Sequence, residues 1–358
     1  MLQIGIDSIT TPISKKQYSH RGSWAYIWTN QLKSYFEHFN IPAEITVLDG
    51  KSSWDDFNCV YLYHGMEFNG KALNLFDGEN DKNLSRLMRV LSRNDTNLYS
   101  LDISMPDFGR LAKRRVKNVN CPDNWKNADW DAVSKKCSEI GALTQADVCE
   151  HLEYDTLILG DSHANSVYKA RSVISRNDGQ TLYGALNKGL SSFIAPFNNR
   201  IKNITLYFGN IDIRHHLMRQ EDPQKSLIKL LEEYERQIIG LNMHNVELIS
   251  VLPIENESRK ISKTFGSYKG TPFFGSWSER TELVKLFNAQ LQSIASRNNW
   301  QFYSHPEHFK NDLGELDFGV MEKPQSVHLS QEFYRWDLRA DCPNKKLESR
   351  HQTSALSW

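Results

Sequence analysis

The sequence contains no stretch of about 18 uninterrupted apolar residues, and it does not open with a basic segment, an apolar run and a small-residue cleavage site. We therefore expect a protein of the cytoplasm that is neither secreted nor bound to a membrane. Charge of one sign is also lacking, because 43 lysines and arginines stand against 43 aspartates and glutamates. A net charge of zero excludes a protein held to nucleic acid by its overall charge, which leaves only local basic patches for that role.

Cysteine is scarce, with five residues in 358 and no Cys-x-x-Cys pair. This spacing argues against a structural zinc site or thioredoxin-like chemistry, and it fits free thiols in a reducing compartment. A phosphate-binding loop is missing as well, because the glycines around Lys71 do not have the spacing of that motif. We predict neither a cofactor nor a bound metal.

Bulky core residues are well represented, with nine tryptophans, 14 tyrosines and 17 phenylalanines. The chain can therefore build a folded core, and its length suits two domains. In the first half we expect strands at residues 2–9, 44–48, 59–63 and 97–104, and helices at 24–39 and 84–92. Such alternation is typical of a parallel sheet covered by helices, so we predict a Rossmann-like α/β domain over residues 1–120.

No clear strand pattern is visible between about 106 and 150, and we interpret residues 121–151 as a connecting segment. The second half is more regular. We expect strands at 154–159, 203–208, 245–252 and 300–304, and amphipathic helices at 224–239 and 279–298. These elements predict a second parallel α/β domain over residues 152–340, followed by a loose polar tail over 341–358.

A serine follows the first strand of the second half, in the block Gly160-Asp161-Ser162-His163. Open α/β sheets bind ligands outside the carboxyl ends of their strands, which is where this serine lies. A glycine permits a tight turn there, and the next helix can direct backbone N–H groups at a developing oxyanion. The same residues would also serve as an ordinary helix cap.

Two further strand ends carry polar residues. Asn210 follows Gly209 after strand 203–208, and its side-chain amide is the neutral donor that an oxyanion hole requires, although Gly-Asn is also common in turns. His328 lies near the end of the ordered chain and is a candidate general base.

These three blocks, in this order and at these strand ends, resemble the SGNH hydrolase family, also called GDSL-type esterases and lipases, over residues 152–336. The resemblance implies a flavodoxin-like three-layer α/β/α fold and a serine hydrolase without a cofactor. It makes Ser162 the nucleophile, Asn210 a side-chain oxyanion donor and His328 the general base. It also implies a backbone donor, which would be Gly184 or Gly189, and of these we favour Gly189.

One position departs from the family pattern, because Gln325 stands where an aspartate usually precedes the catalytic histidine by three residues. A neutral amide cannot stabilise an imidazolium as a carboxylate does. Three explanations remain open. The site could work as a Ser–His dyad, Asp317 or Asp312 could replace the missing carboxylate, or the site could have lost catalysis.

Four more residues are assigned to the surroundings of the substrate: Asp161, His163, Asp212 and Arg214. Asp212 and Arg214 are further expected to pair and to brace the loop of Asn210. The adjacent histidines His215 and His216 do not suggest a metal site, because neighbours in sequence rarely face one ion.

Residues 67–78 and 98–108 resemble the N-terminal lobe of phage DNA β-glucosyltransferases. The resemblance implies a phage protein in a bacterial host that modifies nucleic acid. A nearby basic cluster would then contact DNA phosphates, or it would simply form a solvated helix face. Its members are Arg110, Lys113, Arg114, Arg115 and Lys117.

Three classes of function follow. We favour a serine esterase or acyltransferase that acts on an O-acyl group of a small molecule, a carbohydrate or a modified nucleic acid. The alternatives are a glycosyl- or other group-transferase acting on modified DNA, and a non-catalytic binding protein with an SGNH fold. The long loop 253–280 would form a substrate wall or pack onto the protein. Its aromatic residues are Phe265, Tyr268, Phe273, Phe274 and Trp277.

Overall fold

The computed structural model describes most of the chain, and the expected helix at 84–92 lies outside the described residues. The described ranges are 1–8, 20–48, 53–63, 97–101, 140–177, 179–256, 274–321, 327–330 and 333–334, with single positions at 127, 129, 131–132 and 135.

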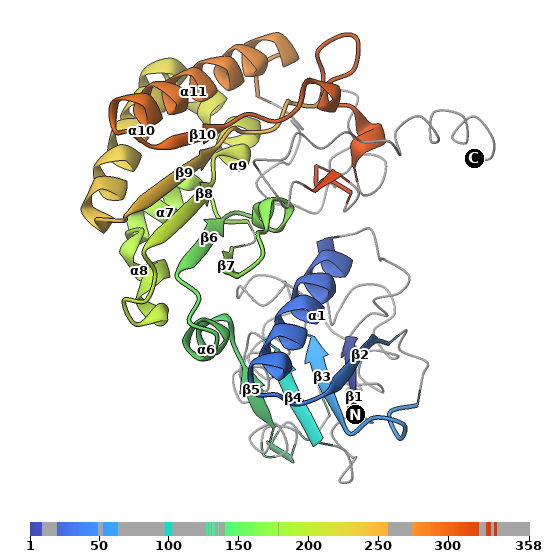
Figure 1. Ribbon diagram of the computed structural model, residues 1–358. Coiled ribbons are helices and arrows are strands. Elements are labelled where there is room, and N and C mark those ends of the chain that lie inside the picture. Colours follow the sequence, from blue (N-terminus) through green and yellow to red (C-terminus); the bar gives the residue numbers. More distant parts are fainter. Residues whose placement is uncertain are drawn as a thin grey trace, which may run out of the picture.

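The first half forms a five-stranded parallel sheet with the order β2-β1-β3-β4-β5 (Figure 1). Its strands are β1 (Leu2–Ser8), β2 (Ala43–Val47), β3 (Cys59–Tyr63), β4 (Asn97–Leu101) and β5 (Gly141–Leu143). Helix α1 (His20–His38) follows β1 and buries Trp28, Leu32 and Phe36 along one face. The predicted parallel α/β sheet is present, but its order is the flavodoxin-like 2-1-3-4-5 and not the Rossmann order 3-2-1-4-5-6.

Two elements occupy the end of the segment that we interpreted as a connection. Strand β5 joins the first sheet beside β4, and helix α6 (Gln145–His151) follows it directly. Thr144 caps this helix through a reciprocal pair of hydrogen bonds with Asp147. The first sheet therefore extends to residue 143. The sequence Gly-Ala-Leu of β5 contains no β-branched or aromatic residue, so it gives little indication of a strand.

The second half repeats the same arrangement, with a parallel sheet in the order β10-β9-β8-β6-β7. Its strands are β6 (Thr156–Gly160), β7 (Ser172–Arg176), β8 (Asn203–Tyr207), β9 (Asn245–Ile249) and β10 (Gln301–Tyr303). Read from β7, the order is again 2-1-3-4-5, so the predicted flavodoxin-like sheet is confirmed. The central strands β6 and β8 are buried beyond their first residues, which explains their continuous apolar runs.

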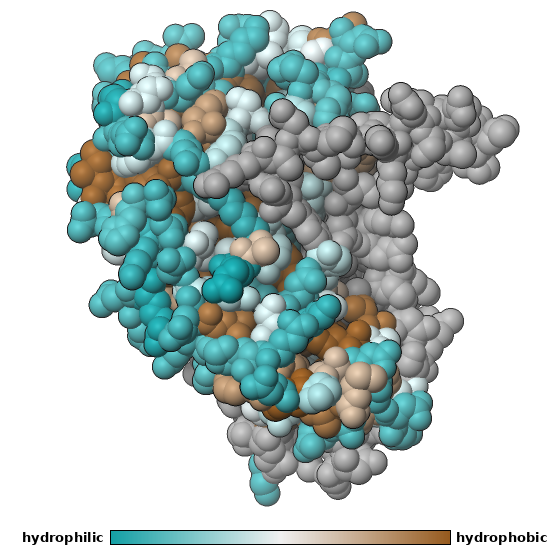
Figure 2. All heavy atoms as spheres, viewed as in Figure 1, coloured by the Kyte–Doolittle hydropathy of each residue, from teal (hydrophilic) through white to brown (hydrophobic). Residues whose placement is uncertain are grey.

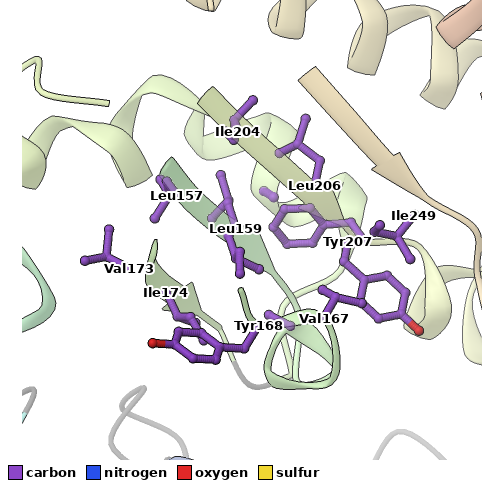
Figure 3. Close-up of a cluster of buried hydrophobic side chains, with 14 of the residues drawn as sticks. Leu157, Leu159, Val167, Tyr168, Val173, Ile174, Ile204, Leu206, Tyr207 and Ile249 are labelled. Atoms are coloured by element: carbon purple, nitrogen blue, oxygen red, sulfur yellow. The ribbon is translucent and has the colours of Figure 1, made fainter. Parts of the chain in front are cut away.

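Helices cover this second sheet and close its core. The helices are α7 (Leu182–Lys188), α8 (Ser191–Ile194), α9 (Asn210–His215), α10 (Pro223–Leu241) and α11 (Trp277–Arg297). Helix α10 contacts both α7 and α11, as expected when successive right-handed crossovers run in one direction across a sheet. The predicted apolar stripe of α10, from Leu227 to Ile238, is buried. Side chains of β6, β7, β8 and β9 fill the interior (Figure 3).

A pair of buried glutamines joins the two halves at the edge strand β7. Gln31 of α1 and Gln145 of α6 exchange hydrogen bonds of 2.8 and 2.7 Å. Gln145 also accepts from the Ile174 N–H, and Gln31 donates to the Ser172 carbonyl. The backbone groups that β7 would leave open are thus partly satisfied by these side chains.

The visible surface of the described residues is mostly hydrophilic, with hydrophobic residues in separate patches (Figure 2). In the part of the chain that the structure describes, no helix combines the length and the apolar character needed to cross a membrane.

Candidate active site

The ends of β6 and β8 and the segment of His328 come together at the carboxyl edge of the second sheet. Strand β6 lies between β7 and β8 (Figure 1), and its last residue, Gly160, pairs with Arg176 of β7 and with Tyr207 of β8. A Cβ on Gly160 would lie 2.4 Å from the Tyr207 carbonyl oxygen, so only glycine allows this close approach. The chain then turns, and Ser162 follows two residues later.

Ser162 lies in hydrogen-bond contact with His328. The Ser162 Oγ and the His328 Nε2 are 2.8 Å apart, although the two residues are far apart in the sequence. The short segment of His328 is held by the Ser330 N–H, which donates to the Val320 carbonyl, and by a bridge between Met321 and Leu329. This is the geometry in which a histidine can take the proton of a serine hydroxyl.

The side chain of Asn210 has a defined orientation beside the serine turn. Its Oδ1 accepts from the Leu252 N–H at 2.9 Å, so its Nδ2 is the atom that faces Asp161, at 3.4 Å from Oδ2. An amide nitrogen carries two hydrogens and can therefore serve a second acceptor beside Asp161, and the Tyr207 hydroxyl group also hydrogen-bonds with this side chain. Gly209, just before it, has φ 108°, and a Cβ there would lie 2.4 Å from the ring of Phe287.

The predicted backbone donor, Gly189, already has a partner within the protein. The Gly189 N–H donates to the Leu186 carbonyl at 3.0 Å and closes the end of α7. The alternative, Gly184, donates its N–H to the Thr181 Oγ1 at 2.9 Å in the first turn of the same helix. Neither amide is left for a substrate.

A third glycine, which the sequence reasoning did not consider, is another candidate for this donor. Gly179 lies three residues beyond Arg176, as Asn210 lies three residues beyond Tyr207, and these two partners flank Gly160. Gly179 has φ 68°, and its N–H donates to none of the residues that the structure describes. The missing signal was β7 itself, which the sequence did not show to be a strand.

Asp161 connects the serine turn to Asn210. It is fully buried, and its Oδ1 accepts from the backbone N–H of His163 at 2.9 Å and lies 2.8 Å from the His163 Nδ1. Burial alone would raise the pKa of Asp161, but the charge and hydrogen bonds of His163, together with Asn210, hold this pKa below its ordinary value. Asp161 and His163 are buried and contact other residues of the site, so their assignment to the substrate is corrected.

Asp212 and Arg214 do not form the expected pair. Asp212 accepts from the backbone N–H groups of Leu182 and Tyr183 at 2.7 and 3.1 Å, which ties α9 to the start of α7. Arg214 instead donates through Nε to the Glu255 carboxylate at 2.8 Å. Both side chains are buried, so they brace the helix that begins with Asn210 and do not line a substrate surface.

The stability of the protein should depend on Asp212 between about pH 4 and about pH 7. Burial raises the pKa of Asp212 to about 6, and the nearby charge of Asp161 adds to this rise. The hydrogen bonds from the Leu182 and Tyr183 backbone N–H groups oppose it. The folded state then holds this proton more tightly than the unfolded state, so stability falls as pH rises through this window. Between about pH 4 and about pH 7, we expect the free energy of unfolding of the wild type to fall by up to about 3 kcal/mol relative to that of Asp212→Asn. Urea unfolding of both proteins at both pH values measures this loss, and a constant difference would contradict it.

Several predicted residues lie outside the described residues. These are Gln325, the basic residues Arg110, Lys113, Arg114, Arg115 and Lys117, and the loop aromatics Phe265, Tyr268 and Phe273. Of the carboxylates offered as replacements, Asp312 is exposed, and Asp317 accepts from the Gly319 N–H at 2.7 Å as the cap of a short 3₁₀ helix. Among the described residues, no cluster of His, Cys, Asp and Glu could hold a metal ion.

The chain matches no protein-family model, and no curated protein matches it. Solved structures that it resembles include a GDSL-like lipase from Bacteroides thetaiotaomicron, with 14% identity, 57% of this chain and 90% of that chain covered, and a TM-score of 0.38. An extracellular lipase from Streptomyces rimosus has 11% identity, coverage of 51% and 95%, and a TM-score of 0.33. Phospholipase A1 from Streptomyces albidoflavus has 11% identity, coverage of 51% and 94%, and a TM-score of 0.32. Identity and TM-score are low, so the roles of the residues are inferred from their own contacts.

Proposed function

We propose that the chain is a serine hydrolase or acyltransferase of the SGNH type that acts on an O-acyl ester. The observation that carries this proposal is the 2.8 Å contact between the Ser162 Oγ and the His328 Nε2 at the carboxyl edge of the sheet. Ligands of open α/β sheets bind at this edge, and a serine that touches a histidine there has the arrangement of an activated nucleophile.

The mechanism begins when His328 accepts the hydroxyl proton and the Ser162 Oγ attacks the carbonyl carbon of the ester. The oxyanion would accept hydrogen bonds from the Ser162 and Gly179 backbone N–H groups and from the Asn210 Nδ2. When the tetrahedral intermediate collapses, the C–O bond of the ester breaks, and the alcohol leaves with the proton from His328. The acyl group then rests on Ser162.

The second half of the reaction mirrors the first. Water or an acceptor hydroxyl gives its proton to His328 and attacks the acyl carbon. The tetrahedral intermediate collapses, the bond to the Ser162 Oγ breaks, and Ser162 regains its proton from His328. Hydrolysis and acyl transfer differ only in the hydroxyl that attacks.

Labelling with a fluorophosphonate probe tests this proposal directly. We expect intact mass spectrometry to show one adduct on the wild type and none on Ser162→Ala. Ser192→Ala is the matched control, because Ser192 is an exposed serine of the same half, and this variant should label like the wild type. A folded wild-type protein that forms no adduct would overturn the proposal.

Loss of the Asn210 amide should slow catalysis without weakening substrate binding to the same extent. We expect Asn210→Ala to lower kcat on the order of 10²–10³-fold, with little change in KM, because the donor acts on charge that develops in the transition state. Asn210→Asp should be at least as slow, since it keeps the acceptor for the Leu252 N–H but removes the donor. Asn245→Ala, at an exposed asparagine of the same sheet, should keep the wild-type rate. Steady-state kinetics on a short acyl ester would measure all four proteins.

A further inference from the structure

One imidazole ring joins the serine turn to the segment of the general base. His163 follows Ser162, and its side chain is almost fully buried. Its Nδ1 lies 2.8 Å from the Asp161 Oδ1, and its Nε2 lies 2.9 Å from the carbonyl oxygen of Val327. Val327 directly precedes His328, so the ring spans from the nucleophile side of the site to the base side.

The partners of this ring determine its protonation. A carbonyl oxygen has no hydrogen to give, so the His163 Nε2 must donate to Val327. The Asp161 Oδ1 already accepts from the His163 backbone N–H. The Asp161 Oδ2 faces the Asn210 Nδ2, whose orientation is set by the bond from the Leu252 N–H to Oδ1. Both oxygens of Asp161 therefore act as acceptors.

An ionised Asp161 fits these contacts, because a carboxylate accepts through both oxygens and has no proton to donate. This agrees with its pKa, which is held below the ordinary value although the residue is fully buried. The His163 Nδ1 must then donate as well, so both ring nitrogens carry a hydrogen. The ring is an imidazolium, and its positive charge is balanced by the carboxylate at 2.8 Å.

We infer that His163 is a positioning residue: an imidazolium held by Asp161 that binds the Val327 carbonyl and so fixes the backbone of His328 at the distance at which its Nε2 reaches Ser162. Its effect on rate rests on the proposed function, whereas its charge does not. The other backbone contacts of this segment described above lie after His328, at Leu329 and Ser330. The bond to Val327 holds the segment on the preceding side. The rings of His163 and His328 lie 5.1 Å apart, centroid to centroid.

The rate of serine labelling should report this positioning. A misplacement of about 1 Å can cost about 10²-fold in rate. We expect His163→Phe, which fills the space but donates no hydrogen bond, to lower the maximal rate constant of fluorophosphonate labelling by roughly 10²-fold. The concentration of probe at half-maximal rate should change little. His163→Gln can still donate one hydrogen bond and should recover part of the rate. His244→Phe, at an exposed histidine of the same half, is the matched control.

A measurement on the wild type avoids any loss of folding in the variants. With ¹⁵N-labelled histidine, NMR of the folded wild type should show that both ring nitrogens of His163 carry a hydrogen. The signal is assigned by its absence in His163→Gln. A ring nitrogen without a proton, or wild-type labelling by His163→Phe, would overturn the inference. If the wild type does not label at all, the proposed function and with it the positioning role fail, while the two NMR protons still decide the charge of the ring.

Discussion

Ester hydrolysis by the Ser162→Ala variant is expected to be slower than that of the wild type on the order of 10⁶-fold in kcat. In the proposed mechanism, alanine removes the atom that would form the acyl-enzyme, and nothing else at the serine turn can replace it. The fold should survive, because the hydrogen bonds that hold the turn come from Asp161 and the backbone and not from the Ser162 Oγ. Hydrolysis of p-nitrophenyl acetate, measured alongside the thermal unfolding midpoint, checks both statements.

Removal of the partner histidine provides the second half of this test. His328→Ala should cost a similar factor, and the double variant should be little slower than either single variant, because the two residues act as one unit. Some acceleration over water should remain in each, since the oxyanion donors are still present. Ser192→Ala should hydrolyse the ester at the wild-type rate. Rapid hydrolysis by purified, folded Ser162→Ala would place the chemistry elsewhere.

The parts of the site that could be predicted from sequence are those carried by local patterns. Ser162 and Asn210 each follow an apolar run and a glycine, and a strand that ends in a turn is a short-range signal. Parallel strands bring their carboxyl ends to one edge, so two such ends imply a shared site. The position of His328 beside Ser162 was implied by the resemblance to the SGNH hydrolase family, and the structure places these two residues in contact.

The errors arose where the answer depended on an element without a local signal. Strand β7 was not expected, so the turn after it was not considered and the choice lay between Gly184 and Gly189. The pairing of Asp212 with Arg214 failed for a geometric reason. Residues two apart on a helix do not face each other, and both lie on α9. The true partner, Glu255, is a loop residue after β9 that belongs to no motif.

Strand order was equally hidden in the first half. The alternation of strands and helices predicts a parallel sheet, but the flavodoxin-like and Rossmann orders use the same local elements. The two orders differ in which strand of the sheet each crossover connection leads to. That choice depends on tertiary packing, such as the glutamine pair that joins α1 to α6 beside β7.

Glu255→Ala is expected to destabilise the folded protein by about 3–5 kcal/mol. Glu255 is fully buried, and Arg214 is nearly so, with 4% of its side chain exposed. Removal of the carboxylate leaves the Arg214 guanidinium buried without its counter-charge, and the desolvation of that charge is then uncompensated. A second buried arginine, Arg280 of α11, donates to the Glu255 backbone carbonyl at 3.1 Å, so the positive charge around this position increases further.

The loss should lower the thermal midpoint by roughly 10 °C, which differential scanning calorimetry resolves easily. Glu255→Gln should lose less, because its amide oxygen can still accept from the Arg214 Nε. Glu282→Ala removes an exposed partner of Lys285 and should leave the midpoint unchanged. Replacing Arg214 by methionine together with Glu255 by leucine should recover much of the loss, since that charge pair is then removed as a whole.

Because Arg214 lies one helical turn after Asn210, Glu255→Ala should also slow ester hydrolysis at temperatures where it is folded. A midpoint within about a degree of the wild type would show that the Arg214 charge is solvated by some other route.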